Sequence, residues 1–513
     1  MAIEQSTKPL TTANTTTMAS TASTAGKTTT YGDKMDRLHE AGIELVAAAV
    51  ILALVMVAAV ALIVIKITHG TSDNGNPETT DLTYREHSKS TTDATATTPD
   101  ERPDTTTEAE ETTVSQQSST AAKKRVLDAY PLLCTYGMHT NQSTQFPDDG
   151  LCDLIFFDSA YKDNTNLLSL PSSFGENMNA FLSAARHYGR TDFGVAFAYE
   201  YRFKLRVDLT VTNPVPLEEI WKRGISDFGI VDMPAFGVQY NDIQETFATL
   251  KELKAVAERK ADAVRPPYIV LGAVPLASAG VYASKMRNLF TPTMFISQGH
   301  YAFGDSHVTF CRVTPTTLLR KGTAWRDYPY DLTEAVAALQ KIKDEGGSAK
   351  LLVSVGMKSR LTTVAEDIVP SMYTAPCIHD VNARAFNSYV EICTDNYWRS
   401  RLQYNNLFTA MYAADPSDSR RFVYDDEYSL CQKMCSIKGS LGHRVRFGIA
   451  VYDLEYEDYL DRCSWLNKFG AFSRVKMVRK IVDYFRNSED SDLRECPQNL
   501  SCDTFKYVPP QAG

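Results

Sequence analysis

The sequence predicts an α/β protein: a (β/α)8 TIM barrel ectodomain, preceded by one transmembrane helix and by disordered Thr-rich segments. Three observations predict this class. Short apolar runs of strand character alternate with helical patterns between residues 126 and 487. The run from Leu45 to Ile65 contains no charged residue. The segments on either side of that run are rich in Thr, Ser and Ala, a composition that buries too little surface to offset the entropy lost on ordering.

The apolar runs of strand character number eight, which is the count that a barrel of this class needs. They are Leu132–Tyr136, Leu154–Asp158, Phe193–Tyr199, Gly229–Asp232, Tyr268–Val274, Met294–Ser297, Lys350–Val355 and Phe447–Asp453. Because strands and helices alternate, we expect parallel strands with a site at their carboxyl ends. An open doubly wound sheet has the same periodicity and stays an alternative on periodicity alone.

Two of the intervening helices carry clear signals. Asp331 is placed to cap a helix, Glu334 completes a capping-box-like start and Gly346 ends it. A second apolar stripe, from Phe472 to Phe485, predicts a helix near the end of the barrel. We expect the basic side chains of that helix to face solvent; they are Arg474, Lys476, Arg479 and Lys480.

The run from Leu45 to Ile65 matches the roughly 20 apolar residues that a helix needs to cross a bilayer. The apolar core of a cleavable signal peptide is shorter and lies nearer to the N-terminus. Basic residues are slightly more frequent before the run than after it, which favours an N-terminus in the cytosol. The sequence therefore predicts a single-pass type II signal anchor.

This topology divides the chain into five parts. They are a disordered cytosolic tail (1–44), the transmembrane anchor (45–66), a disordered Thr/Ser/acidic stalk (67–125), the barrel (126–487) and a C-terminal tail (488–513). The basic triplet Lys123-Lys124-Arg125 is either a site for a shedding protease or a solvated patch.

All 10 cysteines follow the apolar run, between Cys134 and Cys502, which indicates an oxidising compartment. We therefore expect the C-terminal domain to be extracellular or lumenal, on the plasma membrane or a secretory-pathway membrane. Cys496 and Cys502 are close enough in sequence to close a local disulfide loop. The pairing of the others named here stays open; they are Cys311, Cys377, Cys431 and Cys435. Two sequons, at Asn141 and Asn499, predict N-glycosylation.

Several functions have no support in the sequence. A net charge of −9 and a pI near 5.6 give no electrostatic case for nucleic-acid binding. The chain contains no His-Glu-x-x-His, P-loop, Gly-x-Ser-x-Gly or paired Cys-x-x-Cys motif. We therefore predict no metal and no cofactor.

The last part of the barrel region carries a family resemblance. Phe422-Val423-Tyr424-Asp425-Asp426-Glu427-Tyr428-Ser429-Leu430, followed by Gly448-Ile449-Ala450-Val451-Tyr452-Asp453-Leu454-Glu455-Tyr456-Glu457-Asp458-Tyr459, resembles the final barrel segments of glycoside hydrolase family 18. That family includes chitinases and chitinase-like lectins. Tyr452 takes the place of a Trp that ends the last strand in the family.

The resemblance also covers cysteines and one arginine. It implies one disulfide between Cys134 and Cys152 and a second between Cys393 and Cys463. Arg360 follows the seventh predicted strand, where the family carries the Arg of a Tyr-Gly-Arg turn.

The residue that makes these enzymes cut is missing. The family's proton donor is a glutamate at the end of an Asp-x-x-Asp-x-Asp-x-Glu run on the fourth strand, and the substrate's acetamido group acts as nucleophile. That place falls on Met233 or Pro234, neither of which carries a proton to donate, and Asp227 and Asp232 are the remaining acids. After the sixth strand, Gln298-Gly299-His300-Tyr301 replaces Met-x-Tyr-Asp.

These losses predict a catalytically inactive, chitinase-like protein at the cell surface, integral to the membrane. Its barrel would bind chitin, another N-acetylglucosamine glycan or a protein ligand. The candidates for the glycan groove are Tyr136, Tyr199, Asp232, Arg360, Tyr452 and Glu455. Two alternatives stay open: an active membrane-bound glycosidase that uses Asp232 or Glu455 as a relocated acid, and a structural or adhesive ectodomain that binds no sugar.

Overall fold

A computed structural model describes most of the chain from Leu127 to Val508. The described ranges are 127–168, 171–213, 215–260, 265–275, 278–301, 312–322, 328–364, 377, 386–415, 417, 419–441, 444–489 and 491–508. Within these ranges, no helix is both long and apolar enough to cross a bilayer. The predicted transmembrane helix Leu45–Ile65, the cytosolic tail, the stalk and the basic triplet at 123–125 all lie outside the described residues.

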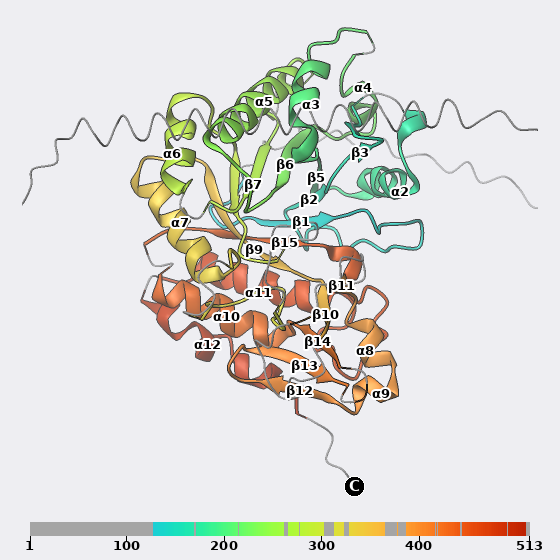
Figure 1. Cartoon of the computed structure of the whole chain (residues 1–513), viewed down its shortest axis with the longest axis vertical. Helices are drawn as coiled ribbons and strands as arrows, with labels where there is room; N and C mark the ends of the chain where they lie inside the picture. The colour runs from blue at the N-terminus through green and yellow to red at the C-terminus, as the bar shows by residue number, and fades with distance from the viewer. Residues whose placement is uncertain are drawn as a thin grey trace, which may run out of the picture. The chain divides into compact units, whose positions relative to one another are not determined.

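Eight parallel strands form a closed barrel in the order β1-β15-β9-β8-β7-β6-β5-β2 (Figure 1). The strands are β1 (Leu132–Tyr136), β2 (Leu154–Phe157), β5 (Asp192–Ala196), β6 (Asp227–Met233), β7 (Ile269–Ala273), β8 (Met294–Ser297), β9 (Lys350–Gly356) and β15 (Gly448–Tyr452). Each coincides with one of the predicted runs, within a few residues at the ends. Leu132 of β1 pairs with Ile449 of β15, so the sheet closes and the doubly wound alternative is wrong.

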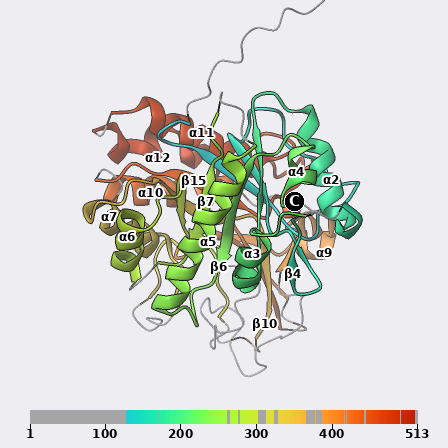
Figure 2. The ribbon, with the colours of Figure 1, turned by 90° about the horizontal axis from the view of Figure 1, so that it is seen from above.

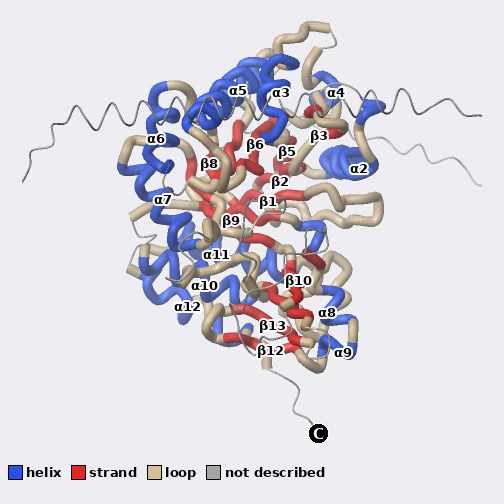
Figure 3. The backbone as a smooth tube through the Cα atoms, viewed as in Figure 1, coloured by secondary structure: helices blue, strands red, loops and turns tan. Residues whose placement is uncertain are grey.

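Helices surround the barrel, as the alternating pattern predicts (Figure 3). They are α2 (Glu176–Ala184), α3 (Arg202–Asp208), α4 (Glu218–Trp221), α5 (Tyr240–Glu258), α6 (Ala279–Asn288), α7 (Leu332–Asp344), α10 (Glu427–Ser440) and α11 (Ser473–Asn487). Figure 2 shows several of these helices around the strands when the molecule is turned. Short elements in the connections are β3 (Tyr161–Lys162), β4 (Thr165–Asn166), η1 (Pro171–Ser173), η2 (Ala185–His187), η3 (Tyr199–Tyr201) and η6 (Leu454–Tyr456).

The apolar residues separate into two layers because strand side chains alternate between the faces of a sheet. One layer fills the barrel interior and consists of Leu133, Leu154, Phe156, Ala196, Val231, Tyr268, Val270, Met294, Ile296, Leu352, Ala450 and Tyr452. The other lies between strands and helices and includes Tyr136, Ile230 and Met233. This division decides which residues near the strand ends can face a ligand.

The two helices with clear signals form where the sequence predicts them. The Asp331 side chain accepts the N–H of Glu334 at 2.7 Å and caps α7. In α11, however, the prediction of a solvated basic face is wrong for most of its members. The Arg474 side chain is buried, and Arg479 forms an ion pair with Asp153 at 3.0 Å and donates to the carbonyl of Leu151 at 2.7 Å.

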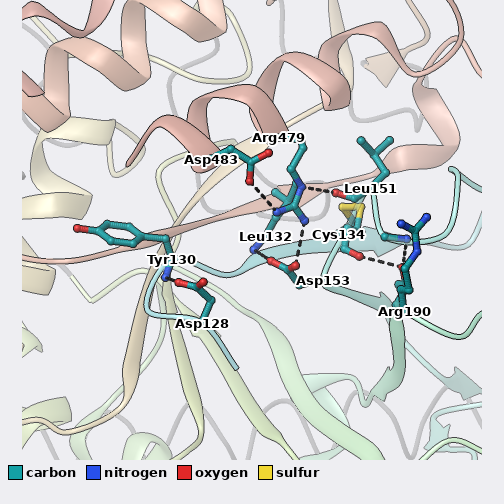
Figure 4. A network of polar contacts seen from close by, with 12 residues as sticks. Asp128, Tyr130, Leu132, Cys134, Leu151, Asp153, Arg190, Arg479 and Asp483 are labelled. Carbon is teal, nitrogen blue, oxygen red and sulfur yellow. Dashed lines mark hydrogen bonds and ion pairs between the residues drawn. A yellow bond between two sulfur atoms is a disulfide. The ribbon is translucent and has the colours of Figure 1, made fainter. Parts of the chain in front are cut away.

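Arg479 is covered because its part of α11 lies against the beginning of β1 and β2, where Leu151 and Asp153 contact it. Figure 4 shows Arg479 between Asp483 on its own helix and Asp153, which also accepts the backbone N–H of Leu132 at 2.7 Å. These contacts lie at the amino ends of the strands, where the residues of such barrels serve stability. Among the four basic residues, Lys480 is the one that is exposed as predicted.

A second sheet, which the pattern of apolar runs did not predict, is inserted between β9 and α10. Its strand order is β11-β10-β14-β13-β12, and all its pairings are antiparallel. The elements are β10 (Ser359–Thr363), β11 (Phe386–Asn387), α8 (Val390–Thr394), α9 (Asn396–Arg399), β12 (Leu402–Asn405), β13 (Ala410–Ala414) and β14 (Arg420–Tyr424). Figure 1 places this sheet at the opposite end of the domain from α3 and α5.

The disulfides confirm the two pairings that the resemblance implied, Cys134–Cys152 and Cys393–Cys463. The predicted local loop between Cys496 and Cys502 is wrong. Both of these cysteines bond to α10 instead, in the pairs Cys431–Cys502 and Cys435–Cys496. Cys377 is also disulfide-bonded, while Cys311 lies outside the described residues.

The C-terminal segment is therefore fastened to the barrel. It folds into η7 (Asp492–Glu495), α12 (Cys496–Asn499) and η8 (Cys502–Phe505). Leu493 and Leu500 are buried in the main apolar core together with the two cysteines. The physical reason for the pairing is proximity in space: Cys431 and Cys435 are one turn apart on α10 and so lie on the same helix face.

Candidate functional site

Polar side chains gather at the carboxyl ends of the barrel strands, which is where the fold places active sites. Asp158 and Ser159 follow β2, Asp232 lies near the end of β6, and Glu455 follows β15. Asp227, the other acid of the fourth barrel strand, lies at the opposite end of β6. It accepts the N–H of Tyr268 at 2.8 Å and pairs with Arg265, so it belongs to the supporting structure and not to this site.

Asp158 and Asp232 are joined through the hydroxyl of Ser159. The Ser159 Oγ lies 2.5 Å from Asp158 Oδ1 and 3.3 Å from Asp232 Oδ2. The other oxygen of Asp232 accepts the backbone N–H of Tyr199 at 3.0 Å. The register of β6 against β7 shifts between Ile230 and Met233, and a bulge of this kind re-aims the side chains beside it. Asp232 thereby reaches across to β2.

This carboxyl pair holds protons unusually firmly. Burial, and next the neighbouring Asp158 carboxyl, raise the pKa of Asp232 to about 8. Burial raises the pKa of Asp158 to about 6, although the Ser159 hydroxyl opposes the shift. Two close carboxyls cannot both ionise easily, so the pair retains a proton at neutral pH.

The raised pKa of Asp232 predicts a pH dependence of stability. In the unfolded chain this carboxyl has a pKa of ~3.9, so between that value and about 8 the folded protein binds more protons than the unfolded one. The free energy of unfolding is therefore expected to fall as the pH rises through this window. An Asp232→Asn variant lacks this ionisable group, so its free energy of unfolding is expected to fall less over the same pH range. Denaturant titrations at pH 5 and pH 8 measure the difference, and an equal offset between the two proteins at both values would refute the expectation.

A second polar group lies beside the pair. Lys358 Nζ forms an ion pair with Asp453 Oδ1 at 3.0 Å, and Glu455 accepts the backbone N–H of Gly137 at 3.0 Å. An added Cβ at Gly137 would lie 2.6 Å from Glu455 Oε1, so a larger residue here would displace the Glu455 carboxyl. Burial, and next Asp453, raise the pKa of Glu455 to about 7.

A cavity of about 220 Å³ adjoins Glu455 on the side of the inserted sheet. It is lined by Ser388, Val390, Glu391, Glu455, Glu457, Asp458, Tyr459, Leu460 and Arg462. Four carboxyl side chains and one arginine share this lining with Val390, Leu460 and Tyr459, so the cavity between the end of β15 and α8 has both charged and apolar walls.

The two residues at the family's proton-donor place do not serve this site. Met233 is fully buried and points outward into the helix layer, where its sulfur accepts a hydrogen bond from the Tyr282 hydroxyl of α6 at 3.3 Å. Pro234 follows the strand and has no ionisable group. The nearest acid in the chain, Asp232, is the one that faces the mouth.

The segment after β8 covers the barrel interior at the carboxyl ends of the strands. Gln298 Nε2 donates to the Val231 carbonyl at 2.6 Å, and His300 Nδ1 lies 2.7 Å from the Ser354 hydroxyl. Burial lowers the pKa of His300 to about 4, so its ring is neutral at ordinary pH. Its Nε2 is buried and has no hydrogen-bond partner.

The structure brings only some of the predicted groove residues to the mouth. Asp232 and Glu455 are there, and both are half-buried. Tyr136 faces the helix layer, where its ring packs 4.4 Å from that of Phe146. Tyr199 is buried beneath the Arg202 guanidinium, which lies 4.0 Å from its ring centroid.

Tyr452 and Arg360 are also unavailable to a ligand in this structure. Tyr452 is 3% exposed, its hydroxyl donates to the Val231 carbonyl at 2.9 Å, and its ring lies 4.4 Å from that of His300. Arg360 lies within β10, buried, with its guanidinium 4.4 Å from the Tyr301 ring. Both side chains support the structure around the mouth.

Sequence reasoning missed Asp158, Ser159, Lys358 and Asp453 as members of the site. Asp158 was the last residue of a predicted strand, and its position at a carboxyl end was a usable signal. Asp453 was likewise the last residue of a predicted strand, whereas Lys358 gave no such signal, because its pairing with Asp453 joins two segments almost a hundred residues apart. Asp425 and Asp426, prominent in the resemblance, are structural: Asp425 pairs with buried Lys433, and Asp426 caps α10 through the Ser429 N–H at 2.8 Å.

In the part of the chain that the structure describes, the grouping with metal-ligand geometry is made of Cys431, Cys435 and Cys502. All three are engaged in disulfides. A disulfide sulfur is not a thiolate, so these side chains do not offer the ligands that a metal requires.

Comparisons with known proteins define the class of fold. No family model matches the sequence, and no curated protein matches it. Solved structures do match: an immunomodulatory chitinase from Trichuris suis has 12% identity over 68% of this chain and 99% of its own, with a TM-score of 0.50. Catalytic domain 2 of the Group II chitinase from Ostrinia furnacalis has 12% identity over 71% and 98%, with a TM-score of 0.50.

A third match is YKL-39, a human pseudo-chitinase, whose structure was solved in the presence of chitooligosaccharides. It has 13% identity over 70% of this chain and 100% of its own, with a TM-score of 0.50. The chain therefore has the fold of chitinases and pseudo-chitinases. Its identity to each of these structures is 12–13%, so the likeness concerns the fold alone.

Proposed function

We propose that this protein is a glycan-binding, chitinase-like protein that does not hydrolyse its ligand. The carrying observation is that Met233, at the family's proton-donor place, is buried in the helix layer and cannot donate a proton. A fold on its own does not assign an activity. The proposal therefore depends on the groups that remain at the mouth, which are several carboxyls and one lysine beside a cavity of about 220 Å³.

These groups fit the hydroxyls and amides of a sugar. Asp232, Asp453 and Glu455 supply oxygen acceptors, and Lys358 supplies a donor. YKL-39, with the same fold, was solved with chitooligosaccharides, which supports an N-acetylglucosamine glycan as the ligand class for this chain. A protein ligand at the same mouth is the second partner that the proposal allows.

The test compares binding with turnover on the purified full-length protein. We expect chitooligosaccharides to bind in calorimetry, and fluorogenic chitooligosaccharides to show no hydrolysis above the buffer rate. Turnover that disappears in the Asp232→Asn variant would overturn the proposal and establish a relocated acid. Absence of both binding and turnover, together with capture of a protein ligand, would favour an adhesive ectodomain.

One specific observation keeps hydrolysis as the second candidate function. Asp232 faces the mouth, and its pKa of about 8 leaves it protonated at neutral pH, as a general acid must be. Asp158 lies beside it and ionises first. This arrangement resembles the paired carboxyls of glycosidases, in which one group is the acid and its neighbour stays charged.

We also propose that the barrel lies outside the cell or in the lumen, held by the predicted helix Leu45–Ile65. Four disulfides in the described residues fit an oxidising compartment. The sequon residues Asn141 and Asn499 are both exposed, so the transferase could reach them during synthesis.

Glycosylation provides the test of this location. When the protein is expressed in secretory cells, endoglycosidase treatment is expected to lower its apparent mass on a gel by the mass of two glycans. In each of the variants Asn141→Gln and Asn499→Gln the decrease should correspond to one glycan. Alkaline extraction of membranes should leave the protein in the pellet. An unglycosylated protein in the soluble fraction would contradict both the orientation and the anchor.

A further inference from the structure

The residue at the family's sugar-stacking place is not free in this chain. Stacking on a pyranose requires an open aromatic face. The ring of Tyr452 is covered by His300, and its hydroxyl is fixed on the Val231 carbonyl. If the mouth binds a sugar, other aromatic residues must supply the open face.

Two pairs of rings lie at the surface on either side of the loop that follows β1. The first pair is Tyr456 and His139, whose centroids are 5.5 Å apart with the rings edge-on. His139 is exposed and Tyr456 is half-buried. Lys358 Nζ lies 5.4 Å from the Tyr456 centroid, so this pair borders the Lys358–Asp453 ion pair of the mouth.

The second pair is Tyr161 and Tyr201, whose centroids are 5.6 Å apart. Both rings are half-buried. The Tyr161 hydroxyl donates to the Met138 sulfur at 3.1 Å, and Met138 is 55% exposed. The Tyr161 N–H donates to the carbonyl of Ser159 at 3.1 Å, and Ser159 is the residue that joins Asp158 to Asp232, so this pair borders the carboxyl pair.

One loop connects the two pairs. Met138 contacts Tyr161 and the next residue, His139, contacts Tyr456. The same loop begins at Gly137, whose N–H holds Glu455. The polar groups of the mouth are therefore bordered by two pairs of aromatic rings, whereas Tyr452, at the family's stacking place, offers no open ring.

We propose that Tyr456 with His139 and Tyr161 with Tyr201 form the sugar-stacking surface of this protein, in place of Tyr452. This inference rests on the proposed function and extends it, because it names the residues that select a glycan of pyranose units. The carboxyls between the pairs then bind hydroxyls while the rings pack on the apolar faces. Removing one of these rings takes away an apolar face on which a pyranose unit would pack.

Calorimetry with a chitooligosaccharide on the full-length protein tests the surface. We expect Tyr456→Ala and Tyr161→Ala each to weaken binding about fivefold or more, a factor that corresponds to ~1 kcal/mol. Tyr452→Phe should bind within about twofold of the unaltered protein, because the ring is covered and Gln298 still donates to the Val231 carbonyl. Tyr240→Ala is the matched control, since this α5 tyrosine is 57% exposed and its hydroxyl accepts a hydrogen bond from Lys285 of α6 at 2.8 Å.

Two further measurements distinguish a loss of binding from a loss of folding. The thermal midpoint of each variant should stay near that of the unaltered protein, and the His139 ring resonances should shift when the glycan is added. Binding that survives in both Ala variants, or that is lost in Tyr452→Phe, overturns this inference and leaves the proposed function standing. Absence of binding by the unaltered protein overturns both.

Discussion

Replacing Arg474 by methionine is expected to lower the free energy of unfolding by about 3–5 kcal/mol, because it leaves a buried carboxylate without its counter-charge. Arg474 is 1% exposed, and its Nη2 lies 2.6 Å from Glu457 Oε2. The same guanidinium donates to the carbonyls of Met357 at 3.0 Å and Asp425 at 3.1 Å, and lies 4.2 Å from the Tyr389 ring. It therefore joins α11 to the ends of β9 and β14.

The size of this effect should depend on the charge that is left behind. Adding Glu457→Gln to Arg474→Met removes the unpaired carboxylate, so the double variant is expected to recover part of the loss. Lys480→Ala is the control on the same helix, because Lys480 is exposed, and it should change stability by no more than about 0.5 kcal/mol. Chemical denaturation measures all three. A double variant as unstable as the single one would contradict the argument.

Removing the Cys435–Cys496 disulfide, by changing both residues to alanine, is expected to cost about 2–5 kcal/mol. The bond closes a sequence separation of 61 residues, so its loss returns considerable chain entropy to the unfolded state. In the native state it fastens α12 to α10 while Leu493 and Leu500 stay in the core. The variant should unfold at lower denaturant and be cut earlier by proteases within residues 491–508. Unchanged stability and cleavage would show that apolar packing alone holds the segment.

Peptide mapping distinguishes this pairing from a local Cys496–Cys502 loop. Trypsin cleaves after Arg421, Lys433 and Lys438 and after Arg494 and Lys506, so Cys431 and Cys435 fall on different peptides while Cys496 and Cys502 share one. The structure predicts a three-peptide product of residues 422–433, 434–438 and 495–506, which falls apart on reduction. A local loop would release 495–506 as a separate peptide.

The site lacks the family's proton donor but retains a neighbouring acid, because successive side chains along a strand point in different directions. Met233 points to the helices, and the shifted register of β6 turns Asp232 toward β2. A barrel can thus lose the family's donor position and still present an acid at its mouth. Whether that acid acts on a sugar is what the Asp232→Asn measurement decides.

The sequence by itself determined the barrel. Eight apolar runs of strand length, separated by helices with capping signals such as Asp331, leave few ways to bury the apolar faces. Two disulfides and the missing donor at Met233 also followed from the residues and their resemblance to a family. These features depend on neighbouring residues or on the order of the segments, so they can be predicted from a sequence pattern.

The tertiary structure alone decided which side chains are exposed and which are paired. The stripe of apolar residues in α11 shows which face of the helix packs on the barrel. It does not show that Arg474, outside that stripe, forms a buried ion pair with Glu457. Strand length predicts neither the direction of Tyr136 nor the cover that His300 places over Tyr452. Cys496 and Cys502 are neighbours in the chain but meet α10 in space. Each of these outcomes depends on the packing of segments distant in sequence, which no local pattern encodes.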